Sequence, residues 1–144
     1  MFDIHTRLTK LACWLMAFNC VVGAITLAIV LPTFQSVVED FSASAILVVL
    51  FIMLLVFNFY LVYRVYQKSV RALKISVWLY VLQIISIETE FFSFYLNTGL
   101  QLTLSWSFEN VVLSINFAAL AISLLLHKAY KGVAYQNETV APVP

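Results

Sequence analysis

The sequence contains little charge, since only 10% of its 144 residues are Asp, Glu, Lys or Arg and 63% are hydrophobic. An ordinary soluble domain carries about 25% charged residues, so this shortage argues against one and places the chain in the membrane class. A formal net charge of +1 gives no basis for binding nucleic acid. Three glycines and three prolines leave little room for loops or linkers.

Groups that carry chemistry are also scarce. Cys13 and Cys20 lie in one apolar run, about 10 Å apart along a helix axis, which is too far for a disulfide. His5 and His127 have no partners at metal-ligand spacing. The sequence has no glycine-rich phosphate loop and no nucleophile elbow. We therefore predict no catalytic residue, no cofactor and no metal site, and we expect that the protein is not an enzyme.

Long apolar runs are the main feature that is present. About 20 apolar residues cross a bilayer core as a helix, whereas an open sheet would leave backbone groups unpaired in lipid. Two apolar runs contain no charged residue. A third is long enough to span only if it includes two glutamates, and a fourth is slightly shorter. We predict an all-α integral membrane protein, in which residues 1–131 form one compact bundle of four transmembrane helices and residues 132–144 form a disordered tail. The predicted spans are residues 11–31, 43–63, 75–96 and 108–127.

Lysine and arginine are absent from the links at residues 32–42 and 97–107. All eight basic residues flank the other ends of the predicted spans, so the positive-inside rule predicts that both termini are cytoplasmic. The compact chain shows no eukaryotic sorting signal, which favours a bacterial inner membrane. The basic residues are Arg7, Lys10, Arg64, Lys68, Arg71, Lys74, Lys128 and Lys131.

The link between the second and third spans holds four of these basic residues. Arg64, Lys68 and Arg71 recur at helical spacing, and Lys74 follows one turn later. We expect an amphipathic helix that continues the second span and lies at the headgroups, where each basic residue gains about 1 kcal/mol from anionic lipid. Two alternatives stay open: a solvated loop that only sets the orientation, or a site for a specific lipid or cytoplasmic partner.

Each predicted span carries one amide side chain in the half of the bilayer nearer the basic residues. At 1.5 Å of rise per residue, the four amides lie very roughly 8 to 16 Å deep. Hydrogen bonds between helices contribute less than about 1–2 kcal/mol per pair, and they fix the register of a bundle or a dimer. We expect this structural role, and a polar permeation path is the alternative. The amide residues are Asn19, Asn58, Gln83 and Asn116.

Two glutamates, Glu88 and Glu90, lie inside the third predicted span. On a helix that starts at Lys74, they are about 20 and 23 Å from the basic side of a core about 30 Å thick. Their side chains diverge by about 200° on a helix, so at most one faces the bundle interior. A charge at this depth is costly, which indicates either a contact with a partner or a helix that ends near Glu88.

The side opposite the basic residues is acidic and contains no Lys or Arg. Its natural complement is a cation, a proton or a protein with a basic surface. We expect a non-enzymatic protein that acts by protein–protein contact at the outer face, as an accessory subunit, an assembly factor or an inhibitor of the immunity-protein type. A small oligomeric transporter or channel that handles protons or cations through Glu88 and Glu90 is the alternative. Membrane lipids and a second copy of the chain are further expected partners. The candidate contact residues are Glu39, Asp40, Glu88, Glu90 and Glu109.

Overall fold

Four helices and four short strands form the described part of the chain. The structure is a computed structural model, and it describes residues 6–34, 43–89, 93–94 and 99–139. The helices are α1 (Arg7–Phe34), α2 (Ala43–Tyr66), α3 (Val70–Leu82) and α4 (Phe117–Thr139). The strands are β1 (Ile85–Thr89), β2 (Ser93–Phe94), β3 (Thr103–Phe108) and β4 (Val111–Asn116).

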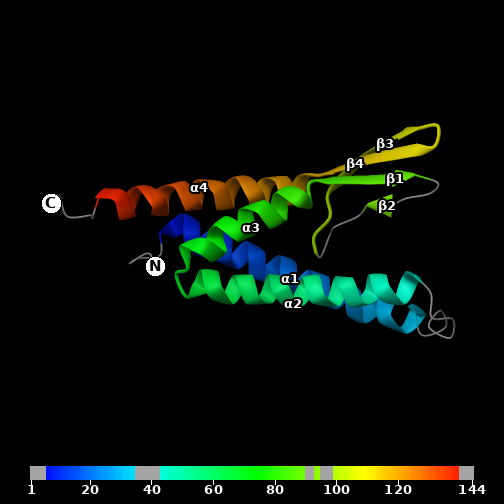
Figure 1. The fold of residues 1–144 in the computed structure, drawn as a ribbon, viewed down its shortest axis with the longest axis horizontal. Coiled ribbons are helices and arrows are strands. Elements are labelled where there is room, and N and C mark those ends of the chain that lie inside the picture. Colours follow the sequence, from blue (N-terminus) through cyan, green and yellow to red (C-terminus); the bar gives the residue numbers. More distant parts are fainter. Residues whose placement is uncertain (1–5, 35–42, 90–92, 95–98, 140–144) are drawn as a thin grey trace.

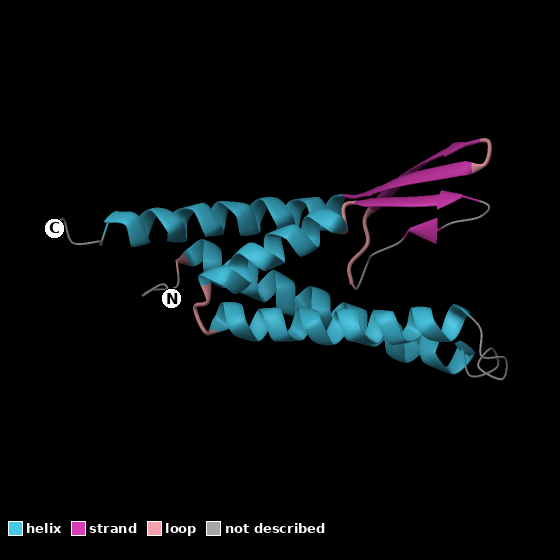
Figure 2. Ribbon diagram, in the orientation of Figure 1, coloured by secondary structure: helices cyan, strands magenta, loops and turns pink. Residues whose placement is uncertain are grey.

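The strands form one antiparallel sheet in the order β2-β1-β4-β3 (Figure 2). β1 begins shortly after α3 ends, and β4 runs directly into α4. In the pairing of β1 with β4, Ile85 lies opposite Ile115 and Thr89 lies opposite Val111. β3 pairs with the other edge of β4, where Leu104 also lies opposite Ile115. The sheet is therefore an extension of the α3–α4 helix pair.

The molecule has two unlike ends (Figure 1). The start of α1, the end of α4 and the turn between α2 and α3 lie together at one end, and the sheet lies at the other. All eight Lys and Arg residues belong to the segments near the first of these ends. We call it the basic end, and we call the opposite end the sheet end.

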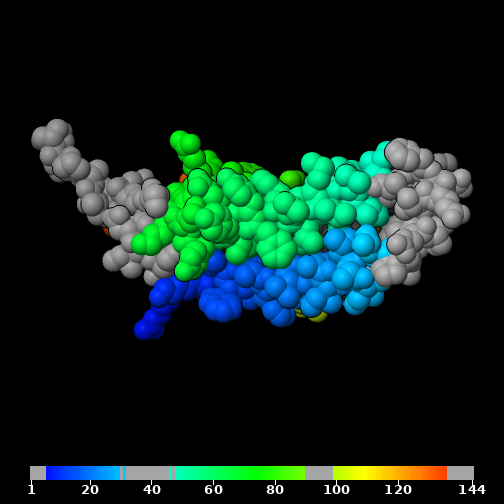
Figure 3. Space-filling model, turned by 90° about the horizontal axis from the view of Figure 1, so that it is seen from below, coloured from blue at the N-terminus to red at the C-terminus, as the bar shows by residue number. Residues whose placement is uncertain are grey.

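The helices differ in length, and this difference sets the level of the sheet. α1 and α2 lie side by side (Figure 3), and their 28 and 24 residues correspond to about 42 and 36 Å of helix. α3 has 13 residues, about 20 Å, so it stops partway along the α1–α2 pair. Beyond α3, the sheet runs at the same level as the halves of α1 and α2 that are distant from the basic end (Figure 1).

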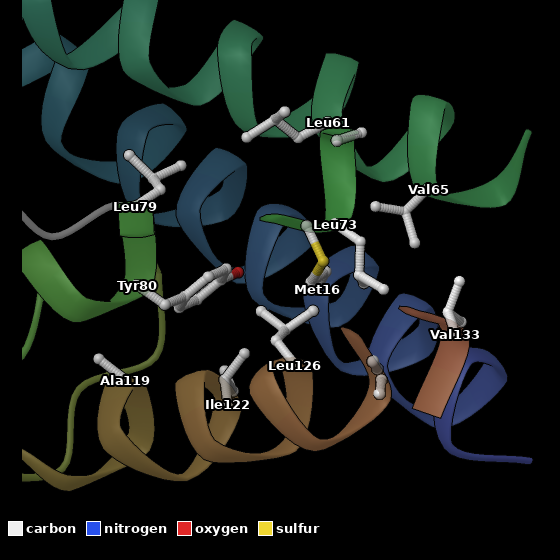
Figure 4. Close-up of a cluster of buried hydrophobic side chains, with 13 residues drawn as sticks. Met16, Leu61, Val65, Leu73, Leu79, Tyr80, Ala119, Ile122, Leu126 and Val133 are labelled. Carbon is white, nitrogen blue, oxygen red and sulfur yellow. The ribbon is translucent and has the colours of Figure 1, made fainter. Parts of the chain in front are cut away.

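The core lies nearer the basic end, where all four helices pack together. Leu73 and Tyr80 of α3, Met16 of α1, Leu61 of α2 and Leu126 of α4 are all at most 1% exposed (Figure 4). α3 packs mainly on α4, and α1 contacts both α2 and α4. In lipid, close packing of this kind holds helices together, because the hydrophobic effect does not act between them.

Within the described residues, three helices are long and apolar enough to cross a membrane, judged by length and composition. These segments are Arg7–Ile29, Val48–Tyr66 and Phe117–Tyr135. Large apolar side chains remain exposed on them, such as Ile25 on α1 and Met53 on α2. Continuous exposed apolar surface of this kind suits hydrocarbon rather than water. The described chain is thus mostly helical, with three candidate spans and a small sheet.

The sheet is the main departure from the predicted all-α fold. The third predicted span, residues 75–96, is helical only to Leu82, and the fourth, residues 108–127, is helical only from Phe117. Residues 85–88 and 103–108 alternate apolar and polar side chains, a period of two that favours a strand over a helix. α4 also continues to Thr139. Residues 132–139 are therefore helical, although we predict a disordered tail for residues 132–144.

The basic link is a tight turn rather than a continuation of α2, so this expectation is wrong. Lys68 has a φ of 64°, and its N–H donates to Val65 O at 2.9 Å. Ser69 N–H donates to Arg64 O at 3.0 Å, which completes a Schellman helix end. The Ser69 hydroxyl oxygen then accepts from Ala72 N–H at 3.3 Å and caps α3. Two adjacent caps therefore interrupt the helix that the spacing of basic residues predicts.

Candidate functional site

Two buried asparagines, Asn19 of α1 and Asn116 at the end of β4, form hydrogen bonds with one irregular segment, residues 99–102. Asn19 Nδ2 donates to the Tyr80 hydroxyl at 3.1 Å, and Asn19 Oδ1 accepts from Leu100 N–H at 2.7 Å. Asn116, the last residue of β4, is the third buried polar residue here. We call Asn19, Tyr80 and Asn116 the polar node, and all three are at most 4% exposed. The node links α1 to α3 and links both to the segment that leads into β3.

Asn116 fixes the point where β4 becomes α4. Its Oδ1 accepts from Ala118 N–H at 3.1 Å and from Ala119 N–H at 3.3 Å, which is the hydrogen bonding of a helix N-cap. The same oxygen accepts from Leu102 N–H at 3.4 Å, and Nδ2 donates to Leu100 O at 3.5 Å. One side chain therefore caps a helix and also holds the neighbouring segment.

Gly99 allows this segment to approach α1 closely. A Cβ at position 99 would overlap both the side chain and the backbone carbonyl of Asn19. Any residue other than glycine would force the two segments apart. Irregular backbone at membrane depth is tolerated only where its polar groups are satisfied by protein or water. The polar node supplies several of these hydrogen bonds.

The other two predicted amides lie elsewhere. Asn58 is buried in α2, and its Nδ2 donates to Leu54 O in the same helix at 3.1 Å. Gln83 is the C-cap residue of α3 and is 4% exposed, and its Nε2 has no hydrogen-bond partner among the described residues. Only Asn19 and Asn116 of the four predicted amides thus meet at one segment.

The structure describes two of the five candidate acids, and neither lies where the sequence predicts. Glu88 is exposed on strand β1, opposite Val112, rather than inside a helix. Glu109 lies in the turn between β3 and β4 with a φ of 41°, rather than in the first turn of a helix. Both belong to the sheet end. The remaining candidates, Glu39, Asp40 and Glu90, lie outside the described residues.

The register divides the side chains of the sheet between one apolar and one polar face, because directly opposed residues of antiparallel strands share a face. The hydroxyl groups of Ser105 and Ser114, which lie opposite each other, are 2.7 Å apart. The apolar sheet face consists of Ile85, Ile87, Leu104, Trp106, Phe108, Val111, Leu113 and Ile115, with Thr89 as its polar member. The polar sheet face consists of Ser86, Glu88, Thr103, Ser105, Ser107, Ser114 and Asn116, with Val112 as its apolar member.

The four basic residues of the link lie at the α2–α3 turn. Arg64, Arg71 and Lys74 are exposed, and Lys68 is half-buried. Arg64 also donates to Gln67 Oε1 at 3.2 Å. Their contact with anionic lipid stays a prediction. Among the described residues, no three His, Cys, Asp or Glu side chains form a group that could hold a metal ion.

Neither the sheet nor the role of Tyr80 is predicted from the sequence. A signal for the sheet is present, because Glu109 and Asn110 separate two short runs rich in β-branched and aromatic residues, a hairpin pattern. Counting apolar residues hides this signal, since such a count averages over the two faces of a strand. Tyr80 has no comparable signal, because an aromatic residue in an apolar helix is ordinary core composition.

Comparisons of the chain with protein-family models, with curated protein sequences and with solved structures gave no match.

Proposed function

We propose that this chain is a non-enzymatic, multi-pass protein of the bacterial inner membrane that acts by binding another protein at its sheet end. In this proposal the chain crosses the membrane four times and its basic end is cytoplasmic, in accord with the positive-inside rule. Its role is that of an accessory, assembly or inhibitor protein. The observation that carries the proposal is the open edge of β3.

β3 is an outer strand of the described sheet, and all six residues of Thr103–Phe108 are exposed. One side of its backbone pairs with β4, and no described strand lies along the other side. An open edge is a template for a further strand, and strand addition is a recurring mode of protein recognition. The sequence TLSWSF also lacks the Lys and Pro residues that commonly block edge pairing.

The position of β3 along the length of the molecule also favours a partner strand at its edge. The sheet runs at the same level as the halves of α1 and α2 that are distant from the basic end (Figure 1). These halves include exposed Ile25, Ile29 and Met53, which suit hydrocarbon. Acyl chains cannot form hydrogen bonds with a strand edge, and each unsatisfied backbone group costs several kcal/mol in lipid. A strand supplied by another protein would satisfy the edge.

The charge of the sheet end favours a basic partner. Glu88 and Glu109 are exposed there, and all Lys and Arg residues belong to segments near the opposite end. Electrostatic complementarity of this kind accelerates association and makes it sensitive to salt. A partner strand flanked by Lys or Arg would match both the edge and the charge.

Site-specific photo-crosslinking in native membranes tests this function. A photoreactive residue at Ser107 of β3 should give an adduct with another protein, because its side chain lies on the edge strand. The same residue at Tyr63, which is exposed on α2 near the basic end, is the matched control and should give no such adduct. High salt, or Glu88→Gln together with Glu109→Gln, should weaken the Ser107 adduct. Equal labelling at both positions, or no adduct at Ser107, contradicts the proposal.

The alternative of a proton or cation transporter has less support. Glu88 is exposed on a strand, whereas a transport carboxylate is expected inside the bundle or a cavity. Purified protein in liposomes distinguishes the two functions. Proton or cation flux that Glu88→Gln abolishes would favour transport and contradict a role limited to protein contact.

A further inference from the structure

The apolar sheet face is uncovered in the described structure. Phe108 is 63% exposed, Ile85 is 51% exposed and Leu104 is 49% exposed. The principal contacts of the sheet are among its own strands, apart from a contact of β3 with α4. Exposure of this many large apolar side chains to water is unfavourable, so the face requires an apolar neighbour.

The apolar surface continues along the chain from the helices into the strands. α3 exposes Trp78 and Leu82 shortly before exposed Ile85 opens β1. On the return path, exposed Phe117 begins α4 directly after β4. No charged residue interrupts either junction, so the surface that suits lipid on the helices extends to the sheet.

The combined length of helix and strand matches the thickness of a membrane. The 13 residues of α3 and the 5 residues of β1 span about 20 and 17 Å. Their sum is close to the length of α2, about 36 Å, and exceeds a hydrocarbon core of about 30 Å. β4 and α4 run in the opposite direction, and the 23 residues of α4, about 35 Å, are long enough to cross the core without β4.

We propose that the sheet lies in the outer leaflet with its apolar face against lipid acyl chains, so that β1 completes the crossing of the membrane that α3 begins. The polar sheet face then points away from lipid. At its root, Asn116 bonds Leu100, which in turn bonds Asn19 of α1. The same division, apolar toward lipid and polar away from it, is found in the strands of membrane barrels. This lipid contact concerns the apolar face of the sheet, whereas the proposed function concerns the edge of β3, so the two are tested separately.

Tryptophan fluorescence reports on this contact directly. The sequence has three tryptophans, of which Trp106 lies on the apolar sheet face. Trp14 and Trp78 are 76% and 62% exposed, so Trp14→Phe with Trp78→Phe should be tolerated and leaves Trp106 as the reporter. In phosphatidylcholine vesicles with brominated acyl chains, Trp106 should lose most of its emission relative to unbrominated vesicles. Acrylamide in the aqueous phase should quench it only weakly.

A matched variant moves the reporter by one residue to the opposite face. Ser105→Trp combined with Trp106→Phe should show the reverse behaviour, with weak quenching by brominated lipid. Ser107→Trp lies on the same polar face and provides a second reporter if the loss of the Ser105–Ser114 contact disturbs folding. Strong quenching of Trp106 by acrylamide would place the face in water, and protection from both quenchers would place it against protein. Either result overturns the proposal, as does equal quenching of the two faces by brominated lipid.

Discussion

Asn19 shows how one amide can stabilise irregular backbone inside a membrane protein. Its Nδ2 donates to the Tyr80 hydroxyl of α3, and its Oδ1 accepts from the N–H of Leu100, in the segment that leads into β3. An amide has donors and acceptors on one group, so a single residue satisfies two unlike partners. The close approach of Gly99 makes this arrangement possible.

Gly99 therefore provides a test at the residue scale. Gly99→Ala should destabilise the protein, because the added Cβ overlaps Asn19, by roughly 1–3 kcal/mol in the free energy of unfolding. Gly132→Ala in α4 is the matched control, since a Cβ there meets no atom within 4 Å. It should be stabilising by about 0.5–1 kcal/mol, because alanine favours a helix. Reversible unfolding in mixed micelles measures both. Equal effects of the two substitutions would contradict the described contact with Asn19.

The polar node also shows the limit of prediction from sequence at this scale. Asn19 and Asn116 are identifiable because an amide in an apolar run is unusual. Their partners are not identifiable, because Leu100 and Leu102 contribute backbone groups that every residue possesses. The sequence therefore reveals which side chains need hydrogen bonds and not where those bonds are made.

At the scale of elements, the boundary between β4 and α4 depends on a single cap. Asn116 is the last residue of the strand, and its Oδ1 accepts from two backbone N–H groups in the first turn of the helix. Without this cap, those groups would need other hydrogen-bond partners. The cap thus helps to set where the strand ends.

Asn116→Ala should lower the free energy of unfolding by about 1–2 kcal/mol, since it removes the cap and the bonds to residues 100 and 102. Asn116→Asp keeps an oxygen that can cap α4 and loses the Nδ2 donor to Leu100 O. Its loss of stability should be smaller than that of the alanine variant. Chemical denaturation of both variants in micelles measures the difference. An alanine variant as stable as the native protein would show that the cap has no role in the boundary.

The elements also explain why the predicted third and fourth spans differ from the structure. Hydropathy alone cannot separate a helix from a helix followed by a strand, because both are apolar over the required length. The alternation in residues 85–88 and 103–108 carries the missing information. α1 and α2 have no such alternation and form the long helices that the apolar runs predict.

The whole molecule is organised by the contrast between its two ends. The basic end contains the start of α1, the end of α4 and the α2–α3 turn, with the core nearby, and the sheet end contains Glu88, Glu109 and the open edge of β3. The separation of charge is readable from the sequence, because every Lys and Arg flanks the same ends of the apolar runs. The sheet that forms the opposite end is not readable in the same way, since β1 and β4 lie within runs long enough to be helices.

The proposed topology places the basic end in the cytoplasm and the tip of the sheet on the outer side of the membrane. Cysteine accessibility tests it most directly, in a background in which Cys13 and Cys20, the two native cysteines, are replaced by alanine. Asn110→Cys lies in the turn at the tip of the sheet, and Gly132→Cys is exposed on α4 toward the basic end. A membrane-impermeant maleimide added to intact spheroplasts should label the Asn110→Cys variant, and should label the Gly132→Cys variant only after the membrane is opened. Labelling of both variants, or of the Gly132→Cys variant alone, before the membrane is opened would contradict the account.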